Sequence, residues 1–262
     1  MAAAQPRNVL EVAAGTGVVT RALTSRLPAE ARIIATDLNQ PMLDEAARRL
    51  NDARVEWRQA DALSLPFENE GFDAVVCQFG AMFFPDKVRA YSEARRVLRR
   101  GARYFFNVWD AIETNDFADA VTQALAEVFP DDPPRFMART PHGYHDEGEI
   151  RAALHTAGFA EVSAETVEAR SRAPSAREAA VAYCQGTPLR NEIEERDAVR
   201  LEEATDRAAK ALSRRFGEGP SRVASGLLSS RLLADEPGMM QGHQQPQGYR
   251  CLEFYPTTYT VV

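Results

Sequence analysis

An alternation of short apolar runs with longer amphipathic stretches, from Asn8 to Val108, constrains the fold of this chain more than any other feature. Short apolar runs are typical of buried strands, and apolar residues spaced three and four apart are typical of helices. Their repetition predicts βα units, which join neighbouring parallel strands. We therefore expect a mostly parallel α/β sheet. Its first five strands are predicted at residues 9–13, 32–36, 55–59, 72–77 and 104–108.

Three residues mark the ends of the intervening helices. Pro28 stops the first helix, Asn39 is placed to cap the second, and Gly101 is placed to end the third in the left-handed conformation. Apolar side chains recur at helical spacing in all three, which predicts one buried face for each helix. The predicted faces are Val19, Leu23 and Leu27; Leu43, Ala47 and Leu50; and Val88, Tyr91, Ala94 and Leu98.

The rhythm breaks at residues 110–145, which carry a predicted helix at 116–128 and the proline-rich turn FPDDPPRF. An insertion after the fifth strand is a candidate lid. Asp146 and Glu149 have the spacing of a capping box and predict the start of another helix. A sixth strand at 160–167 and a long charged helix at 190–216 follow. We expect residues 1–217 to form one domain.

The chain changes character after Gly217. Residues 218–262 are rich in Gly, Pro, Ser and Gln and show no sustained hydrophobic period. Such composition is typical of segments that bury little apolar surface. We therefore predict a disordered or loosely attached tail.

Charge and cysteine content exclude several classes of protein. The net charge is −7 and the basic residues are scattered, whereas a nucleic-acid site needs clustered cations. The three cysteines share no metal-like spacing, and their odd number does not indicate a disulfide framework. No apolar run is long enough to span a bilayer, and the N-terminus lacks a signal-peptide core. We expect a cytoplasmic protein with neither metal, membrane span nor nucleic-acid partner; the oligomeric state stays open.

The segment VLEVAAGTG, which begins at Val9, is the first candidate binding motif. Gly15 and Gly17 allow a tight turn between a strand and a helix, and they let a ligand approach backbone N–H groups at the helix N-terminus. The alternative is that both glycines serve only the turn.

Two aspartates extend this motif toward a nucleoside site. Asp37 ends the second strand about 20 residues after the turn, where a carboxylate can accept hydrogen bonds from both ribose hydroxyls. Asp61 follows the third strand, where it can accept from the exocyclic amine of adenine, with Ala62 beside the base. The alternatives are a solvated or capping role for Asp37 and a turn role for Asp61.

The nucleoside need not belong to a dinucleotide. In the NAD fingerprint G-x-G-x-x-G, Ala13 would take the first glycine position and Thr20 the third, so the match is incomplete. Glu11 lies inside the strand, and an acid there suits a ligand with ammonium and sulfonium cations better than one with two phosphates. An NAD-dependent oxidoreductase is therefore the less favoured alternative.

Taken together, the motifs resemble the class I methyltransferases, in particular the methyltransferase type 11 family related to the C-methyltransferases of ubiquinone and menaquinone biosynthesis. The resemblance covers about the first 110 residues. It implies a Rossmann-like, doubly wound sheet of strand order 3-2-1-4-5-7-6, S-adenosyl-L-methionine as cofactor and a small-molecule acceptor. The segments that carry it are LEVAAGTG, ATDLNQPML, QADALSLPF, GFDAVVCQFGAMFFPD and SEARRVLRRGARYFFNVWD.

The resemblance also implies roles for individual residues. Those implied to bind the cofactor are Glu11, Ala13, Gly15 and Gly17 for the methionine part, Asp37 for the ribose, Leu38 and Met42 for the adenine edge, and Asp61 and Ala62 for the base. Gln78 is implied to begin the acceptor side.

The chain departs from the family pattern at both ends. Only eight residues precede Val9, so the cap helices that usually come before the first strand are expected to be missing. The usual last strand has no evident counterpart after Gly217, although GLLSSRLLA or TTYTVV would supply one. We expect both ends to be altered, through a misplaced start and a shifted reading frame. A catalytically impaired cofactor-binding module is therefore an alternative.

Methyl transfer from a sulfonium needs alignment and exclusion of water more than covalent help. If the acceptor needs a base, the candidates are His142, Tyr144 and His145, because histidine titrates near neutral pH. A purely structural role is the alternative for each histidine. An apolar acceptor pocket would favour an aromatic or quinone-like substrate, unless its residues are simply core. Its candidate residues are Phe79, Met82, Phe83, Phe84 and Trp109.

Overall fold

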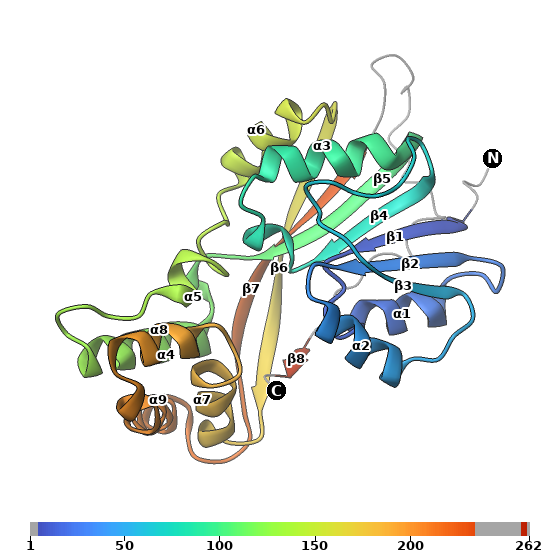
Figure 1. Cartoon of the computed structure of the whole chain (residues 1–262). Coiled ribbons are helices and arrows are strands. Elements are labelled where there is room, and N and C mark those ends of the chain that lie inside the picture. Colours follow the sequence, from blue (N-terminus) through green and yellow to red (C-terminus); the bar gives the residue numbers. More distant parts are fainter. Residues whose placement is uncertain (1–4, 234–257, 261–262) are drawn as a thin grey trace. The chain divides into compact units, whose positions relative to one another are not determined.

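The computed structural model describes residues 5–233 and 258–260. These residues divide into two compact units (Figure 1). Unit 1 contains the chain up to Val108, residues 146–165 and the described residues from 229. Unit 2 contains residues 109–145, residues 166–228 and the described residues after 254.

The five N-terminal strands of unit 1 pair in parallel, as the sequence predicts. They are β1 (Asn8–Val12), β2 (Arg32–Asp37), β3 (Val55–Gln59), β4 (Phe72–Gln78) and β5 (Leu98–Trp109). β1 lies in the middle of this set, with Leu10 opposite Ile34 of β2 and Val75 of β4. Leu10 is fully buried, because a strand covered on both faces needs apolar side chains on both.

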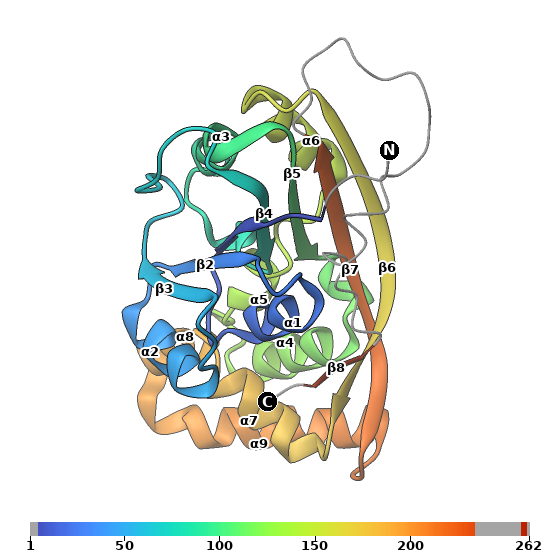
Figure 2. The ribbon, with the colours of Figure 1, turned by 90° about the vertical axis from the view of Figure 1, so that its right-hand side faces the viewer.

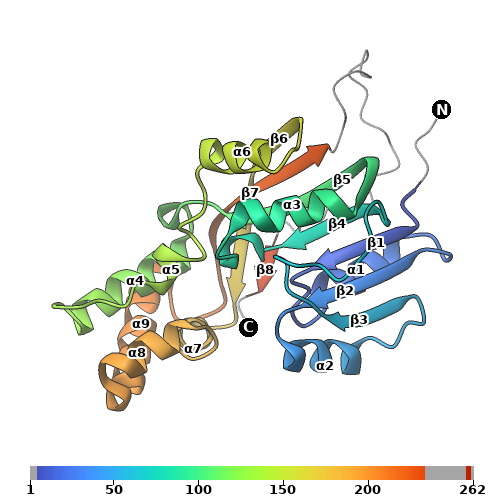
Figure 3. The same cartoon turned by 45° about the horizontal axis from the view of Figure 1, so that its top comes forward.

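Helices cover both faces of this sheet. Figure 3 shows α1 (Val18–Arg26) and α2 (Gln40–Arg49) on one face and α3 (Lys87–Val97) and α6 (Glu147–Thr156) on the other. The short helix η1 (Ala81–Phe83) follows β4.

Two helix ends were predicted from local sequence patterns, and only one prediction is correct. The capping box is confirmed, since the Asp146 side chain accepts from the Glu149 N–H at 2.7 Å. The prediction that Gly101 ends the third helix is wrong. α3 stops at Val97 and Gly101 lies inside β5 with φ 73°, because pairing with β4 begins at Leu98.

The strand order is β3-β2-β1-β4-β5-β7-β6-β8, so the order 3-2-1-4-5-7-6 implied by the resemblance is confirmed. The added strands are β6 (Glu161–Ala173), β7 (Ser221–Leu233) and β8 (Thr258–Thr260). Figure 2 shows β7 running opposite to β6.

The prediction of an irregular tail is wrong for residues 221–233, which form β7. The last strand, which the sequence did not reveal, is therefore present as β7. The inference of a shifted reading frame loses its support. A strand with a neighbour on each side is held by main-chain hydrogen bonds from distant segments, so its own side-chain pattern is a weak guide. The remainder of the predicted tail, residues 234–257 and 261–262, lies outside the described residues.

Unit 2 is mainly helical. It contains η2 (Ile112–Thr114), α4 (Asp116–Val128), α5 (Phe136–Arg139), α7 (Ala176–Cys184), α8 (Leu189–Asp197), η3 (Ala198–Arg200) and α9 (Leu201–Phe216). The predicted helix at 116–128 is confirmed as α4. The predicted helix at 190–216 is instead interrupted at η3, where the Asp197 side chain accepts from the Val199 N–H.

The segment predicted as a lid-like insertion shares a core with later helices. Phe117 and Val121 of α4 belong to the same buried cluster as Ala208 and Leu212 of α9. Arg215 of α9 also pairs with Asp116 and Asp119 of α4. Within the described ranges, no helix combines the length and the apolar character that a bilayer crossing requires.

Candidate functional site

The predicted cofactor residues all lie in unit 1, at the carboxyl edge of the parallel strands. Because β1 to β4 run parallel, the loops that follow them emerge at one edge (Figure 1). Ligands of open α/β sheets bind at this edge.

The loop after β1 is a turn that requires glycine. Gly15 has φ 55° and Gly17 has φ 74°, a region that other residues rarely adopt. A Cβ at Gly17 would lie 2.8 Å from Cη2 of Trp57, so a side chain is excluded there on steric grounds as well. A Cβ at Gly15 would meet nothing within 4 Å, so the space above this turn is open. Ala13 also has a positive φ, 56°, and is the strained residue of the motif.

Asp37, at the end of β2, is held against this turn. Its Oδ2 accepts from the Gly15 N–H at 2.9 Å, and its Oδ1 accepts from the Asn39 N–H at 2.8 Å. A carboxylate has about four lone-pair positions, so two bonds leave room for two more. Asp37 is partly exposed and is therefore able to accept from a pair of hydroxyl groups.

Glu11 is the most perturbed acid of the site. It is 1% exposed, and its Oε2 accepts from the Thr20 hydroxyl at 2.7 Å. Burial, and to a smaller extent the nearby Asp37 carboxylate, raise the pKa of Glu11 to about 8 against the opposing hydrogen bond from Thr20. A cation brought next to Glu11 would favour its ionised form.

Thr20 bears on the choice between ligands. It takes the position of the third glycine in the NAD fingerprint, and its fully buried side chain is bonded to Glu11. The helix therefore approaches the strand through a threonine–glutamate bond, in place of the close glycine contact of that fingerprint. This arrangement disfavours a dinucleotide.

Asp61 lies beside Asp37 along the sheet. Gln59 is paired with Asp37 in the β2–β3 register, and the Ala60 N–H donates to the Asp37 carbonyl at 3.0 Å. The Asp61 Oδ1 accepts from the Leu63 N–H at 2.9 Å, so Asp61 does form a turn. Its side chain is exposed, so the second oxygen is accessible. Ala62 follows, partly exposed.

Apolar side chains stand exposed at the same edge. Leu38 is 68% exposed and Met42 is 44% exposed, beside the aspartate that ends β2. Val18, at the start of α1, is 61% exposed. Ligand sites combine apolar side chains with a few polar groups, and this edge offers both.

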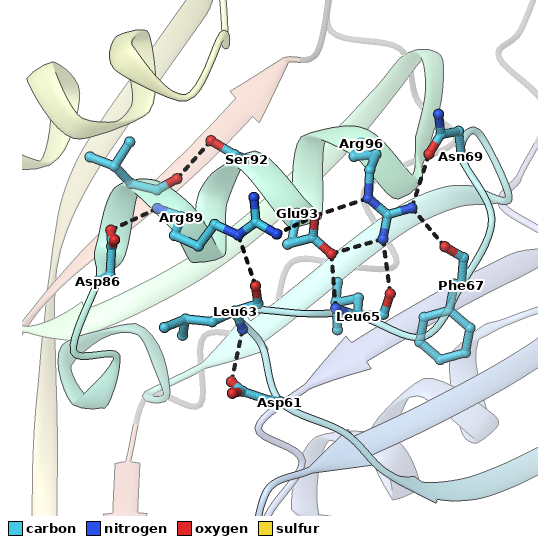
Figure 4. A network of polar contacts seen from close by, with 11 residues as sticks. Asp61, Leu63, Leu65, Phe67, Asn69, Asp86, Arg89, Ser92, Glu93 and Arg96 are labelled. Atoms are coloured by element: carbon cyan, nitrogen blue, oxygen red, sulfur yellow. Dashed lines mark hydrogen bonds and ion pairs between the residues drawn. The ribbon is translucent and has the colours of Figure 1, made fainter.

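An ion pair between the buried Glu93 and the partly exposed Arg96 fixes the loop that carries Asp61 (Figure 4). Glu93 of α3 accepts from the Leu65 N–H at 2.9 Å and from Arg96 at 2.8 and 2.9 Å. Arg96 in turn donates to the carbonyl oxygens of Leu65 and Phe67. Arg89 donates to the Leu63 carbonyl at 3.0 Å. Sequence reasoning missed this network, whose only signal is Arg89, Glu93 and Arg96 at helical spacing in RAYSEARR.

The loop after β4 contacts the glycine turn. A Cβ at Gly80 would lie 2.5 Å from the Cβ of Ala13, so only glycine allows this approach. Gln78 is the last residue of β4 and is partly exposed. Among the predicted acceptor-pocket residues here, Phe83 is 51% exposed, whereas Met82 and Phe84 are buried.

The candidate bases His142, Tyr144 and His145 belong to unit 2. His142 is 4% exposed and its Nδ1 lies 2.9 Å from the Asp110 carbonyl oxygen, which indicates an Nδ1–H donor. Burial lowers the pKa of His142, so its ring is neutral at pH 7. The Nδ1 of His145 contacts the His142 carbonyl at 2.7 Å, and Tyr144 is buried. Catalytic roles for these residues stay predictions.

Comparison with known proteins finds similarity to methyltransferases in the N-terminal part of the chain. Residues 9–101 match the family model described as methyltransferase domain. The chain is 31% identical over 164 residues to a ubiquinone/menaquinone biosynthesis C-methyltransferase UbiE of Xylella fastidiosa, covering 58% of this chain and 65% of that protein. It is 42% identical over 101 residues to a demethylmenaquinone methyltransferase of Thermus thermophilus, covering 37% of this chain and 45% of that one.

Solved structures share the fold. A crystal structure of a putative methyltransferase from Bacillus halodurans superposes with a TM-score of 0.56 at 19% identity, covering 90% of this chain and 96% of that one. At this identity the likeness shows the fold alone. The chain covers less than two thirds of the length of the curated relatives named above.

Proposed function

Because the sequence of residues 9–101 matches a methyltransferase domain and the chain has the class I methyltransferase fold, we propose that it is an S-adenosyl-L-methionine-dependent methyltransferase acting on a small-molecule acceptor. The observation that carries the proposal is the bond between the Asp37 carboxylate and the Gly15 N–H. It joins the predicted ribose acceptor to the turn predicted to hold the methionine end. Both then serve one ligand.

The residues present fit this cofactor. The cofactor supplies an activated methyl group on a sulfonium, which leaves as a neutral thioether. Asp37 accepts from the ribose hydroxyls, and Asp61 accepts from the adenine amine between the apolar groups Leu38 and Met42. Glu11 is a buried acid near the turn whose pKa is raised by burial; an ammonium or sulfonium cation bound beside it would favour its ionised form and pair with it.

We place an aromatic or quinone-like molecule on the acceptor side. The relatives named above are quinone-biosynthesis methyltransferases, and the exposed Phe83 offers an aromatic surface in the loop after β4. If deprotonation of the acceptor is required, His142, Tyr144 and His145 stay the candidate bases predicted from the sequence; a neutral His142 ring with Nδ1–H has an Nε2 that can accept a proton. A cytoplasmic location and the absence of a nucleic-acid partner stay predictions.

Calorimetric titration with S-adenosylmethionine, S-adenosylhomocysteine and NAD tests the proposal. We expect the first two ligands to bind and Asp37→Ala to weaken them by about 1–3 kcal/mol, the cost of leaving polar ribose groups unpaired. The matched control is Asp44→Ala, an exposed aspartate of α2 whose side chain bonds Gln40. Equal binding by wild type and Asp37→Ala, or tighter binding of NAD, would contradict the proposal.

Methyl transfer needs its own measurement. Tritium from labelled S-adenosylmethionine should appear in an organic extract when a reduced naphthoquinone lacking the ring methyl is added. Tight cofactor binding without transfer to any acceptor would instead support a binding-only module.

A further inference from the structure

Asn107 is a buried polar residue at the carboxyl end of β5 that the cofactor site does not use. It interrupts the apolar run YFFNVW, is 5% exposed and is paired with Gln78 of β4. Burial of an amide is costly unless its donors and acceptors are used. The position therefore raises the question of which partners the side chain has.

One half of the amide is satisfied by the backbone. The Phe79 N–H donates to the Asn107 Oδ1 at 3.2 Å, while also approaching the Asn107 carbonyl oxygen at 3.1 Å. Because an N–H can only donate, the side-chain atom facing it is the oxygen, and the NH2 group takes the other side. This bond also supports Phe79 in its strained conformation, φ 53°.

The other half of the amide is available. Among the residues that the structure describes, none accepts a hydrogen bond from Asn107 Nδ2, yet this nitrogen is not sealed from solvent. A donor that is fixed in direction, almost wholly buried and still reachable suits a ligand atom better than it suits packing.

The donor also lies close to the turn assigned to the methionine end. Phe79 is bonded to Asn107, and the next residue, Gly80, packs against Ala13 so closely that a Cβ would lie 2.5 Å away. Ala13 opens the glycine turn. A molecule bonded to Asn107 therefore lies one loop residue from the segment that would hold the reactive end of the cofactor.

We propose that Asn107 determines acceptor specificity by donating a hydrogen bond from Nδ2 to a carbonyl or hydroxyl oxygen of the acceptor. The inference rests on the proposed function and adds to it a residue that would select the acceptor by an oxygen on its ring. The exposed Phe83 in the same loop offers the apolar surface for such a ring. An acceptor whose only polar group is a cationic amine would find no partner in this donor.

Two substitutions separate the ligand role from the structural one. Asn107→Asp keeps an oxygen for the Phe79 N–H but removes the NH2 donor, whereas Asn107→Ala removes both. The probes are α-tetralone and tetralin, two redox-stable rings that differ by one carbonyl oxygen. Their dissociation constants are measured on protein saturated with S-adenosylhomocysteine.

We expect wild type to bind α-tetralone roughly five- to tenfold more tightly than tetralin, the value of one hydrogen bond in a largely buried site. Asn107→Asp, measured where its carboxylate is ionised, should lose this preference while still folding and binding S-adenosylhomocysteine. Asn107→Ala should lose the preference and also melt earlier, because the Phe79 N–H loses its side-chain partner.

The inference is overturned if Asn107→Asp still binds α-tetralone more tightly than tetralin. It is also overturned if the wild type shows no such preference, whether it binds both rings or neither. These outcomes are distinct from failure of the proposed function, in which S-adenosylhomocysteine itself does not bind.

Discussion

Glu11→Gln gives the sharpest test of the electrostatics of the site. Glu11 is buried inside β1, and burial raises its pKa from 4.5 to about 8. The unfolded chain ionises this acid near pH 4.5, whereas the folded protein holds the proton to about pH 8. The folded state thus gains stability at low pH that it loses as pH rises.

The magnitude follows from linkage. Between the two pKa values the free energy of unfolding falls by about 1.4 kcal/mol per pH unit because of this group alone. Over the whole interval the loss is on the order of 5 kcal/mol. Glutamine has nearly the same shape, does not titrate and can accept from the Thr20 hydroxyl. The difference in stability between Glu11→Gln and wild type should therefore grow in favour of the variant from pH 5 to pH 8.

The assay is urea unfolding of the ligand-free protein at pH 5, 6, 7 and 8. Trp57 lies in unit 1 and packs near Gly17, so its fluorescence in a Trp109→Phe background reports on this unit. Thr20→Val is the matched comparison: it removes the hydrogen bond that lowers the pKa, so the pH-dependent loss should extend to higher pH. A stability difference between Glu11→Gln and wild type that does not change with pH would refute the reasoning.

Three further predictions concern stability and protonation. Gly17→Ala should destabilise unit 1 by about 3 kcal/mol, because of backbone strain and the contact with Trp57. Gly15→Ala has open space around it and should cost only about 1 kcal/mol. Equal losses of unfolding free energy in urea would contradict this. Glu93→Gln should cost about 1–3 kcal/mol and speed amide hydrogen exchange in residues 61–69, because it removes the charge of the buried partner in the ion pair that holds this loop. Unchanged exchange there would disprove the positioning role. Nitrogen NMR should find the His142 ring neutral, with Nδ1 protonated, at pH 7. The stability that the buried neutral ring contributes should be lost as pH falls below about 6.5. A cationic ring at pH 7 would be incompatible with the burial of His142.

Local patterns were sufficient for the strands and for the glycine turn. Five parallel strands, the capping box at Asp146 and the positions of Asp37 and Asp61 depend on residues close together in the chain, and the structure has them where the sequence predicts them. Short-range sterics and capping act over a few residues, so the sequence shows them directly.

Non-local contacts account for the errors. β7 was predicted as part of a disordered tail from its composition. That prediction failed because the hydrogen-bond partners of β7 in the sheet come from distant segments of the chain. The Gly101 prediction failed for the same reason, since pairing with β4 sets where α3 ends.

By itself the sequence determined that a strand, a glycine turn and two aspartates follow one another at a spacing that would suit an adenosine. This spacing is a property of the chain. Only the tertiary structure decided that the Asp37 oxygen binds the Gly15 N–H, that Glu11 is buried deeply enough to hold a proton at neutral pH, and that Asn107 keeps a free donor. Direction, burial and hydrogen-bond satisfaction are set by neighbours across the sheet, and no spacing along the chain encodes them.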